Sequence, residues 1–245
     1  MNRMAVVSVH SGEQLFAVSH GTFEGELGST DPMQLEELVR LMQVVALCSE
    51  TEIVGGSGDY KLEGSPTENA LVDLALQAGI DVPALRARHP VARTRYRAEG
   101  RPYMSTVHPY TDGKFLLAVN GSPEEVLAMC DHQIRQGKRV RLTKAARTSI
   151  LSENENMAGK ALRVLGVAYR ELDDDQITGK TRGLIWLGLA GMAFSACAAW
   201  RRRSLALTLV VVMWAALWLP WARIDRATFQ YHVYASLPFL IVALA

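Results

Sequence analysis

The stretch Gly64-Ser65-Pro66-Thr67-Glu68-Asn69-Ala70-Leu71 contains the signals that start an α-helix. A serine at the N-cap can accept a hydrogen bond from the first turn, and proline suits the first helical position because its missing N–H would have no partner there. A glutamate three residues after the serine completes a capping box. Apolar residues then recur at helical spacing until Gly79, which predicts a helix that ends near this glycine.

The same device returns in Gly121-Ser122-Pro123-Glu124-Glu125. Between the two helix starts lie the apolar runs 104–108 and 114–119, joined through an Asp-Gly turn, which predicts a β-hairpin. Further elements are a hairpin of 5–9 and 15–18, helices over 31–48 and 143–157, and a strand over 162–169. Helices and antiparallel strands mix without regular β-α-β alternation, so the expected fold class is α+β, an antiparallel sheet flanked by helices.

Charged residues divide the chain in two. Of the 26 Lys and Arg and 25 Asp and Glu residues, only six follow Leu184, and they are Arg201, Arg202, Arg203, Arg223, Asp225 and Arg226. The first 183 residues therefore carry a net charge of −3 and the last 62 carry +4. We expect a polar domain over residues 1–183 and an apolar segment over residues 184–245.

The apolar segment contains three uncharged runs, 184–200, 204–222 and 227–245. A bilayer core needs about 20 apolar residues per helix, so two or three transmembrane helices are expected after the α+β domain. The lipid bilayer is then a partner and the membrane the location, with residues 1–183 in the cytoplasm because no signal peptide opens the chain. Two spans satisfy the positive-inside rule better than three, which would place Arg201, Arg202 and Arg203 outside. A buried hairpin in a soluble core is the alternative.

Several function classes are disfavoured by composition. A near-neutral balance without a Lys/Arg block argues against a nucleic-acid partner. Cys48, Cys130 and Cys197 are far apart and odd in number, so buried free thiols are expected rather than disulfides or a zinc site. The glycine-rich stretch 55–58 lacks the lysine and flanking elements of a P-loop and is interpreted as a turn. The scattered histidines form no catalytic constellation, so no catalytic residue and no metal ligand is assigned.

Four stretches, taken in order, resemble the nucleotide-binding (N) domain of P-type cation-transporting ATPases, in the calcium-pump-like branch. They are 64–71, 101–105, 120–124 followed by Cys130, and 162–170. The resemblance covers roughly residues 1–190 and implies an antiparallel-sheet pocket that binds ATP, with Mg²⁺ present only in the ATP complex. The implied nucleotide-binding residues are Glu68, Tyr96, Asn120, Gly121, Arg163 and Leu165.

Each of these residues receives a role from the resemblance. Glu68 would contact the purine and Tyr96 would stack on it, while Arg163 with Leu165 would close the phosphate side, where the planar fork of an arginine pairs with phosphate oxygens. The lysine of the family's Lys-Gly pair is Asn120 here, before Gly121. Loss of that cation is expected to weaken ATP binding by about 1–3 kcal/mol.

The resemblance also implies missing chemistry. In these pumps the phosphorylated aspartate lies in Asp-Lys-Thr-Gly-Thr-Leu-Thr, shortly before a segment like residues 2–4, and Ala193-Phe194 stands where a distal Asp-Pro is expected. Without that carboxylate no aspartyl-phosphate can form. We therefore expect a membrane-tethered partial ATPase that is not a functional pump by itself.

The tail resembles a different family, the C-terminal membrane region of bacterial polyprenyl- or dolichyl-phosphate-mannose protein mannosyltransferases, over residues 184–245. The matching stretches are 219–221, 225–232 and 236–240. One alternative function is therefore a fragment of such a membrane glycosyltransferase fused to an ATPase piece. Another is a structural membrane protein whose polar domain binds a protein partner.

Overall fold

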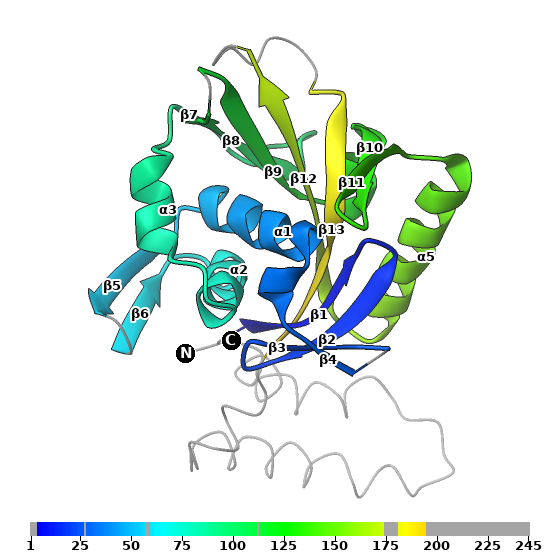
Figure 1. Ribbon diagram of the computed structural model, residues 1–245, viewed down its shortest axis with the longest axis horizontal. Helices are drawn as coiled ribbons and strands as arrows, with labels where there is room; N and C mark the ends of the chain where they lie inside the picture. Colours follow the sequence, from blue (N-terminus) through cyan, green and yellow to red (C-terminus); the bar gives the residue numbers. More distant parts are fainter. Residues whose placement is uncertain (1–3, 27, 57–58, 112, 174–180, 195–245) are drawn as a thin grey trace, which may run out of the picture. The chain divides into compact units, whose positions relative to one another are not determined.

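The computed structural model describes residues 4–26, 28–56, 59–111, 113–173 and 181–194 (Figure 1). These residues have the expected α+β fold, with one large sheet and a separate hairpin of β5 (Glu52–Gly56) and β6 (Asp59–Glu63). Adjacent strands of the large sheet follow the order β4 (Gly28–Thr30), β3 (Thr22–Gly25), β2 (Gln14–Ser19), β1 (Met4–Ser11), β13 (Leu184–Phe194), β12 (Arg163–Leu172), β9 (Phe115–Gly121), β8 (Tyr103–Pro109) and β7 (Arg93–Arg95).

The predicted hairpins are confirmed. β1 pairs antiparallel with β2, and β8 pairs antiparallel with β9. A further strand, β10 (Cys130–Arg135), pairs antiparallel with β11 (Lys138–Arg141) and parallel with the start of β13. In the glycine-rich stretch, Gly55 and Gly56 belong to β5, while residues 57–58 lie outside the described part of the chain.

Helices cover both faces of the sheet. One core contains side chains of α1 (Glu36–Leu47), α2 (Pro66–Gln77) and α3 (Val82–Arg88), and the other contains side chains of α4 (Pro123–Ala128) and α5 (Lys144–Gly159). Alternate residues of β9 serve the two cores, Leu116 and Ala118 the first, Leu117 and Val119 the second. Figure 1 shows α1, α2 and α3 grouped together, with α5 apart from them. A 3₁₀ turn, η1 (Pro32–Gln34), precedes α1.

The prediction of a membrane helix over residues 184–200 is wrong for the first part of this range. Leu184–Phe194 is the strand β13, and its neighbours Trp186 and Leu187 enter opposite cores. A strand buried on both faces is a continuous apolar run, which hydropathy does not distinguish from a membrane helix. Within the described ranges, no helix is long and apolar enough to cross a bilayer. Residues 195–200 and the candidate helices 204–222 and 227–245 lie outside the described residues.

The two helix starts differ in their caps. Ser65 caps α2 as predicted, because its hydroxyl accepts the N–H of Glu68 at 3.3 Å. The predicted cap at Ser122 is wrong. The helix α4 does begin at Pro123, but the Ser122 hydroxyl makes no capping bond and donates to the Glu124 carboxylate at 2.8 Å. The sequence motif therefore predicted both helix starts and only one of the two serine caps.

Candidate functional site

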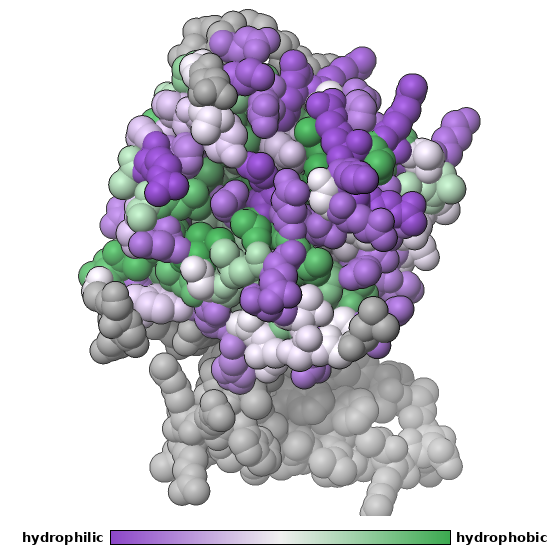
Figure 2. All heavy atoms as spheres, viewed as in Figure 1, coloured by the Kyte–Doolittle hydropathy of each residue, from purple (hydrophilic) through white to green (hydrophobic). Residues whose placement is uncertain are grey.

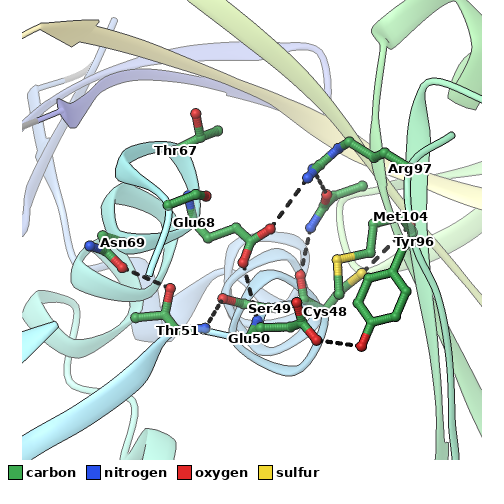
Figure 3. A network of polar contacts seen from close by, with 12 residues as sticks. Cys48, Ser49, Glu50, Thr51, Thr67, Glu68, Asn69, Tyr96, Arg97 and Met104 are labelled. Carbon is green, nitrogen blue, oxygen red and sulfur yellow. Dashed lines mark hydrogen bonds and ion pairs between the residues drawn. The ribbon is translucent and has the colours of Figure 1, made fainter. Parts of the chain in front are cut away.

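Glu68 stands in the first turn of α2 with its carboxylate turned away from the cap. One carboxylate oxygen accepts the backbone N–H of Glu50 at 3.2 Å, and the other pairs with the Arg97 guanidinium at 3.3 Å (Figure 3). The side chain is only 10 % exposed. The carboxylate thus forms contacts with distant segments instead of the return bond of a capping box.

Asn120, near the end of β9, links Arg97 to the end of α1. Its side-chain oxygen accepts a hydrogen bond from Arg97 at 2.5 Å, and its side-chain nitrogen donates to the carbonyl of Cys48 at 2.7 Å. Asn120 is fully buried, so both polar ends of its amide are satisfied inside the protein. We call Glu68, Arg97, Asn120 and the Cys48 carbonyl the Arg97 network.

The thiol of Cys48 lies directly beside this network and is chemically quiet. It is free and buried, and it donates a weak hydrogen bond to the carbonyl of Met104. Burial raises the pKa of the Cys48 thiol to about 12, so the thiol stays protonated. Cys130 is also free and buried, as the sequence predicts, and Cys197 lies outside the described residues.

Tyr96 directly precedes Arg97 and is exposed. The residue is 54 % exposed, and its hydroxyl donates to the Glu50 carboxylate at 2.6 Å, a bond that raises the pKa of Tyr96. The Arg101 guanidinium donates two hydrogen bonds, at 3.1 and 2.5 Å, to the carbonyl of Tyr96. Side chain and backbone of Tyr96 are both held, which leaves a ring fixed at the surface.

Gly121 allows two backbones to approach closely beside the site. A Cβ at this position would lie 2.3 Å from Cβ of Tyr103 and 2.5 Å from the carbonyl oxygen of Pro102. The next residue, Ser122, donates its N–H to the same Pro102 carbonyl at 2.9 Å. Gly121 therefore holds the end of β9 against β8, one residue from Asn120.

Arg163 and Leu165 lie on the same face of the sheet as Asn120 but outside the Arg97 network. Asn120 pairs with Val167 of β12, and Leu165 and Arg163 follow at alternate positions toward the start of that strand. Leu165 is buried, and Arg163 is exposed without a hydrogen bond or ion pair to another described residue. The structure brings Glu68 and Asn120 together through Arg97, and leaves these two residues apart from that network.

A hollow elsewhere on this side of the molecule contains none of the predicted site residues. It has a volume of about 210 Å³ and lies between α1, α3 and the turn after β8. Its lining consists of Gln43, Leu47, Leu85, Arg88, His89, Tyr110, Thr111 and Leu116. Figure 2 shows apolar side chains exposed in the middle of the viewed face, among hydrophilic ones. The volume is below the range of about 300–1,000 Å³ usual for small-molecule pockets.

Sequence reasoning missed three groups of the site: Arg97, the carboxylate of Glu50 and the carbonyl of Cys48. Arg97 directly follows the predicted site residue Tyr96, but several other arginines occupy the same stretch. Glu50 and Cys48 follow α1 and carry no motif. Only tertiary contacts select these groups.

Fold and site together define an α+β domain with a network of polar contacts on one face of a largely antiparallel sheet. Residues 37–193 match the family described as P-type ATPase, cytoplasmic domain N. This match covers more than half of the chain, which therefore belongs to that family. The match ends at residue 193, within β13, so residues 184–193, which were expected to resemble mannosyltransferases, belong to the N domain instead.

Individual relatives agree with the family. Calcium-transporting ATPase 1 of Lactococcus lactis is 29% identical over 69% of this chain, and cation-transporting ATPase pma1 of Synechocystis is 29% identical over 78%. A plasma membrane-type calcium-transporting ATPase 4 of Arabidopsis thaliana is 31% identical over 62% of the chain. The matched regions are 19%, 22% and 15% of these relatives. The chain thus spans about a fifth of the proteins it matches.

Proposed function

We propose that this chain binds ATP at the site formed by Tyr96 and the Arg97 network. The observation that carries the proposal is the placement of an exposed, fixed aromatic ring next to a carboxylate and a guanidinium. A ring can stack on a base, a carboxylate can accept from an amino group, and a guanidinium can bind phosphate. Membership in the N-domain family supports the same ligand.

The predicted residues other than Asn120 then have these roles. Tyr96 stacks on the adenine, and Glu68 accepts a hydrogen bond from the exocyclic amino group of the adenine. Guanine has an oxygen acceptor in place of this amino group. Gly121 keeps the strand ends close, and Arg163 and Leu165 flank the phosphate side. Mg²⁺ enters only as part of the ATP complex. Binding is weak, in the range where millimolar nucleotide is needed for saturation.

Replacing Tyr96 by alanine tests the proposal. Base stacking on an aromatic ring contributes about 1–3 kcal/mol, so the variant should bind both ATP and adenosine about tenfold more weakly or worse. The side chain is half exposed, and its loss should change stability little. Equilibrium dialysis of the full chain, purified in detergent, against labelled ATP and adenosine gives the two dissociation constants.

Val91 supplies the matched control. It is an apolar side chain of similar exposure, 55 % against 54 % for Tyr96, and Val91→Ala should leave both dissociation constants unchanged. Tyr96→Phe keeps the ring and should retain binding. If the unaltered chain shows no saturable binding at millimolar ATP, or if Tyr96→Ala binds as well as Val91→Ala, the proposed site is wrong.

We further propose that residues 204–222 and 227–245 tether the domain to a membrane, with the N domain on the cytoplasmic side. The support is the length and apolar character of both runs. Membranes from cells that express the full chain should then release it into detergent and not into high salt, since salt removes only electrostatically bound proteins. Release of the chain by salt alone would contradict the tether.

A further inference from the structure

Within the ATP site proposed above, on which the following step rests, we infer that Arg97 contacts the phosphates in addition to Arg163. Asn120 is the residue that positions Arg97. Among the described residues, Arg97 is the only cation with a hydrogen bond or ion pair to Glu68 or Asn120. Figure 3 shows its side chain reaching toward the carboxylate of Glu68 from the segment that follows β7.

Asn120 is suited to hold a guanidinium and unsuited to bind a ligand itself. It is fully buried, and its amide already accepts from Arg97 and donates to the carbonyl of Cys48. A lysine at this position has three donors and no acceptor, so it could not accept the Arg97 hydrogen bond. It would also bring a second positive charge against the guanidinium, which is unfavourable away from water.

Arg97 keeps capacity for an anion. Its side chain is 37 % exposed, and two of its nitrogens bond to Glu68 and Asn120, whereas a guanidinium has five N–H donors. The ion pair with Glu68 measures 3.3 Å, which is longer than the roughly 2.7–2.9 Å of a strong charge-assisted hydrogen bond. A triphosphate carries several negative charges and can compete for this guanidinium without breaking the Asn120 bond.

The structure changes the expectation for Asn120. The sequence alone predicts that Asn120 removes a cation from the nucleotide site, but the position beside it is occupied by the positive charge of Arg97. Tyr96 and Arg97 are consecutive residues, so one short segment supplies both the ring for the base and the cation for the phosphates. ATP affinity then depends on Arg97 and not on restoring a lysine at position 120.

The substitution Arg97→Gln, which removes the positive charge, tests this assignment. The binding of ATP is compared with that of adenosine, which has no phosphates. We expect about tenfold weaker ATP binding, equivalent to about 1.4 kcal/mol, and an adenosine dissociation constant within about twofold of the unaltered chain. Equilibrium dialysis of the full chain in detergent measures both. Arg95→Gln is the matched control, because it removes the same charge from the neighbouring strand β7 without touching the network.

Asn120→Lys adds an independent arm. In the unaltered background it should not tighten ATP binding, because the introduced ammonium group and the Arg97 guanidinium would repel each other. In the Arg97→Gln background the same substitution should recover part of the lost ATP affinity. Urea midpoints of all variants, followed by pulse proteolysis, show whether each one is folded.

The outcomes separate this assignment from the proposed function. Absence of ATP binding by the unaltered chain contradicts the proposed function itself. If the unaltered chain binds ATP normally, two results would overturn the role of Arg97. One is an ATP dissociation constant of Arg97→Gln equal to that of Arg95→Gln, and the other is an equal loss of ATP and adenosine binding by Arg97→Gln. Tighter ATP binding by Asn120→Lys alone would also overturn it, since the site would then lack a cation.

Discussion

Replacing Gly188 by alanine is expected to lower the free energy of unfolding by at least about 3 kcal/mol, because the added methyl group would overlap with backbone atoms. A Cβ at this position would lie 2.2 Å from the backbone oxygen of His10 and 3.0 Å from Cδ1 of Leu41. Strand β1 is held in the sheet at this point, where the Ser11 hydroxyl donates to the Leu187 carbonyl at 2.6 Å. Pulse proteolysis of the full chain in urea should show a much lower midpoint.

Gly191 offers a control in the same strand. Its Cβ would lie 3.1 Å from Cδ1 of Leu162 and 3.3 Å from Sδ of Met157, and the ends of these side chains can move. Gly191→Ala should therefore cost less than about 1 kcal/mol. Equal urea midpoints for the two variants would contradict the close approach of β1 and β13.

The pair of variants also distinguishes the two interpretations of the apolar run that begins at Leu184. In the strand, Gly188 lies against β1 and α1, and an added methyl group is strongly unfavourable. In a membrane helix, an alanine in place of glycine would be neutral or favourable, because alanine has the higher helix propensity. The sign of the stability change therefore tests the placement of this segment in the core.

Local structure could be predicted because its signals lie within a few residues of one another. Ser65 and Pro66 mark the start of α2, and Thr143 marks the start of α5, where its hydroxyl accepts the N–H of Ala146 at 3.1 Å. The turn between β8 and β9 is encoded in the same local way. Each of these features depends on backbone preferences and short-range hydrogen bonds, which the sequence displays directly.

β13 could not be predicted from local information. A strand between two cores and a membrane helix both have uncharged, apolar sequences. The spacing of apolar residues could distinguish a strand from a helix, but an irregularity in the strand obscures it here. The register against β12 shifts between Val167 and Ala168, so Leu187 and Gly188 face the same core. What fixes the strand is its pairing with β1, β10 and β12, which are distant in the sequence.

The residues of the candidate site also include some that the sequence could predict and one that it could not. Glu68 and Tyr96 could be named from motifs, because both lie next to recognisable stretches. Arg97 could not be chosen over Arg93, Arg95 or Arg101 from sequence alone, since all four occur in one arginine-rich stretch. Folding selects Arg97 by bringing α2 and β9 to the same place.

Replacing Arg86 by methionine is expected to lower the free energy of unfolding by about 3 kcal/mol. The guanidinium of Arg86, on α3, donates to the carbonyls of Ala46, Ser49 and Thr51 at 3.0, 3.5 and 2.6 Å. The Ala46 carbonyl lies in the last turn of α1, where carbonyls have no partner within the helix and a cation is favourable. Ser49 and Thr51 lie in the segment that follows the helix. Burial lowers the pKa of Arg86, consistent with a shielded contact. The urea midpoint of the full chain measures the loss.

Arg88→Met is the matched control, because Arg88 is on the same short helix, is exposed and makes no hydrogen bond or ion pair with another described residue. Its urea midpoint should stay close to that of the unaltered chain. The Arg86 variant should also bind ATP more weakly where it is still folded, since the segment that it holds carries the Cys48 carbonyl and Glu50. An Arg86→Met chain as stable as Arg88→Met would show that the end of α1 is held by other contacts, and that the site does not depend on α3.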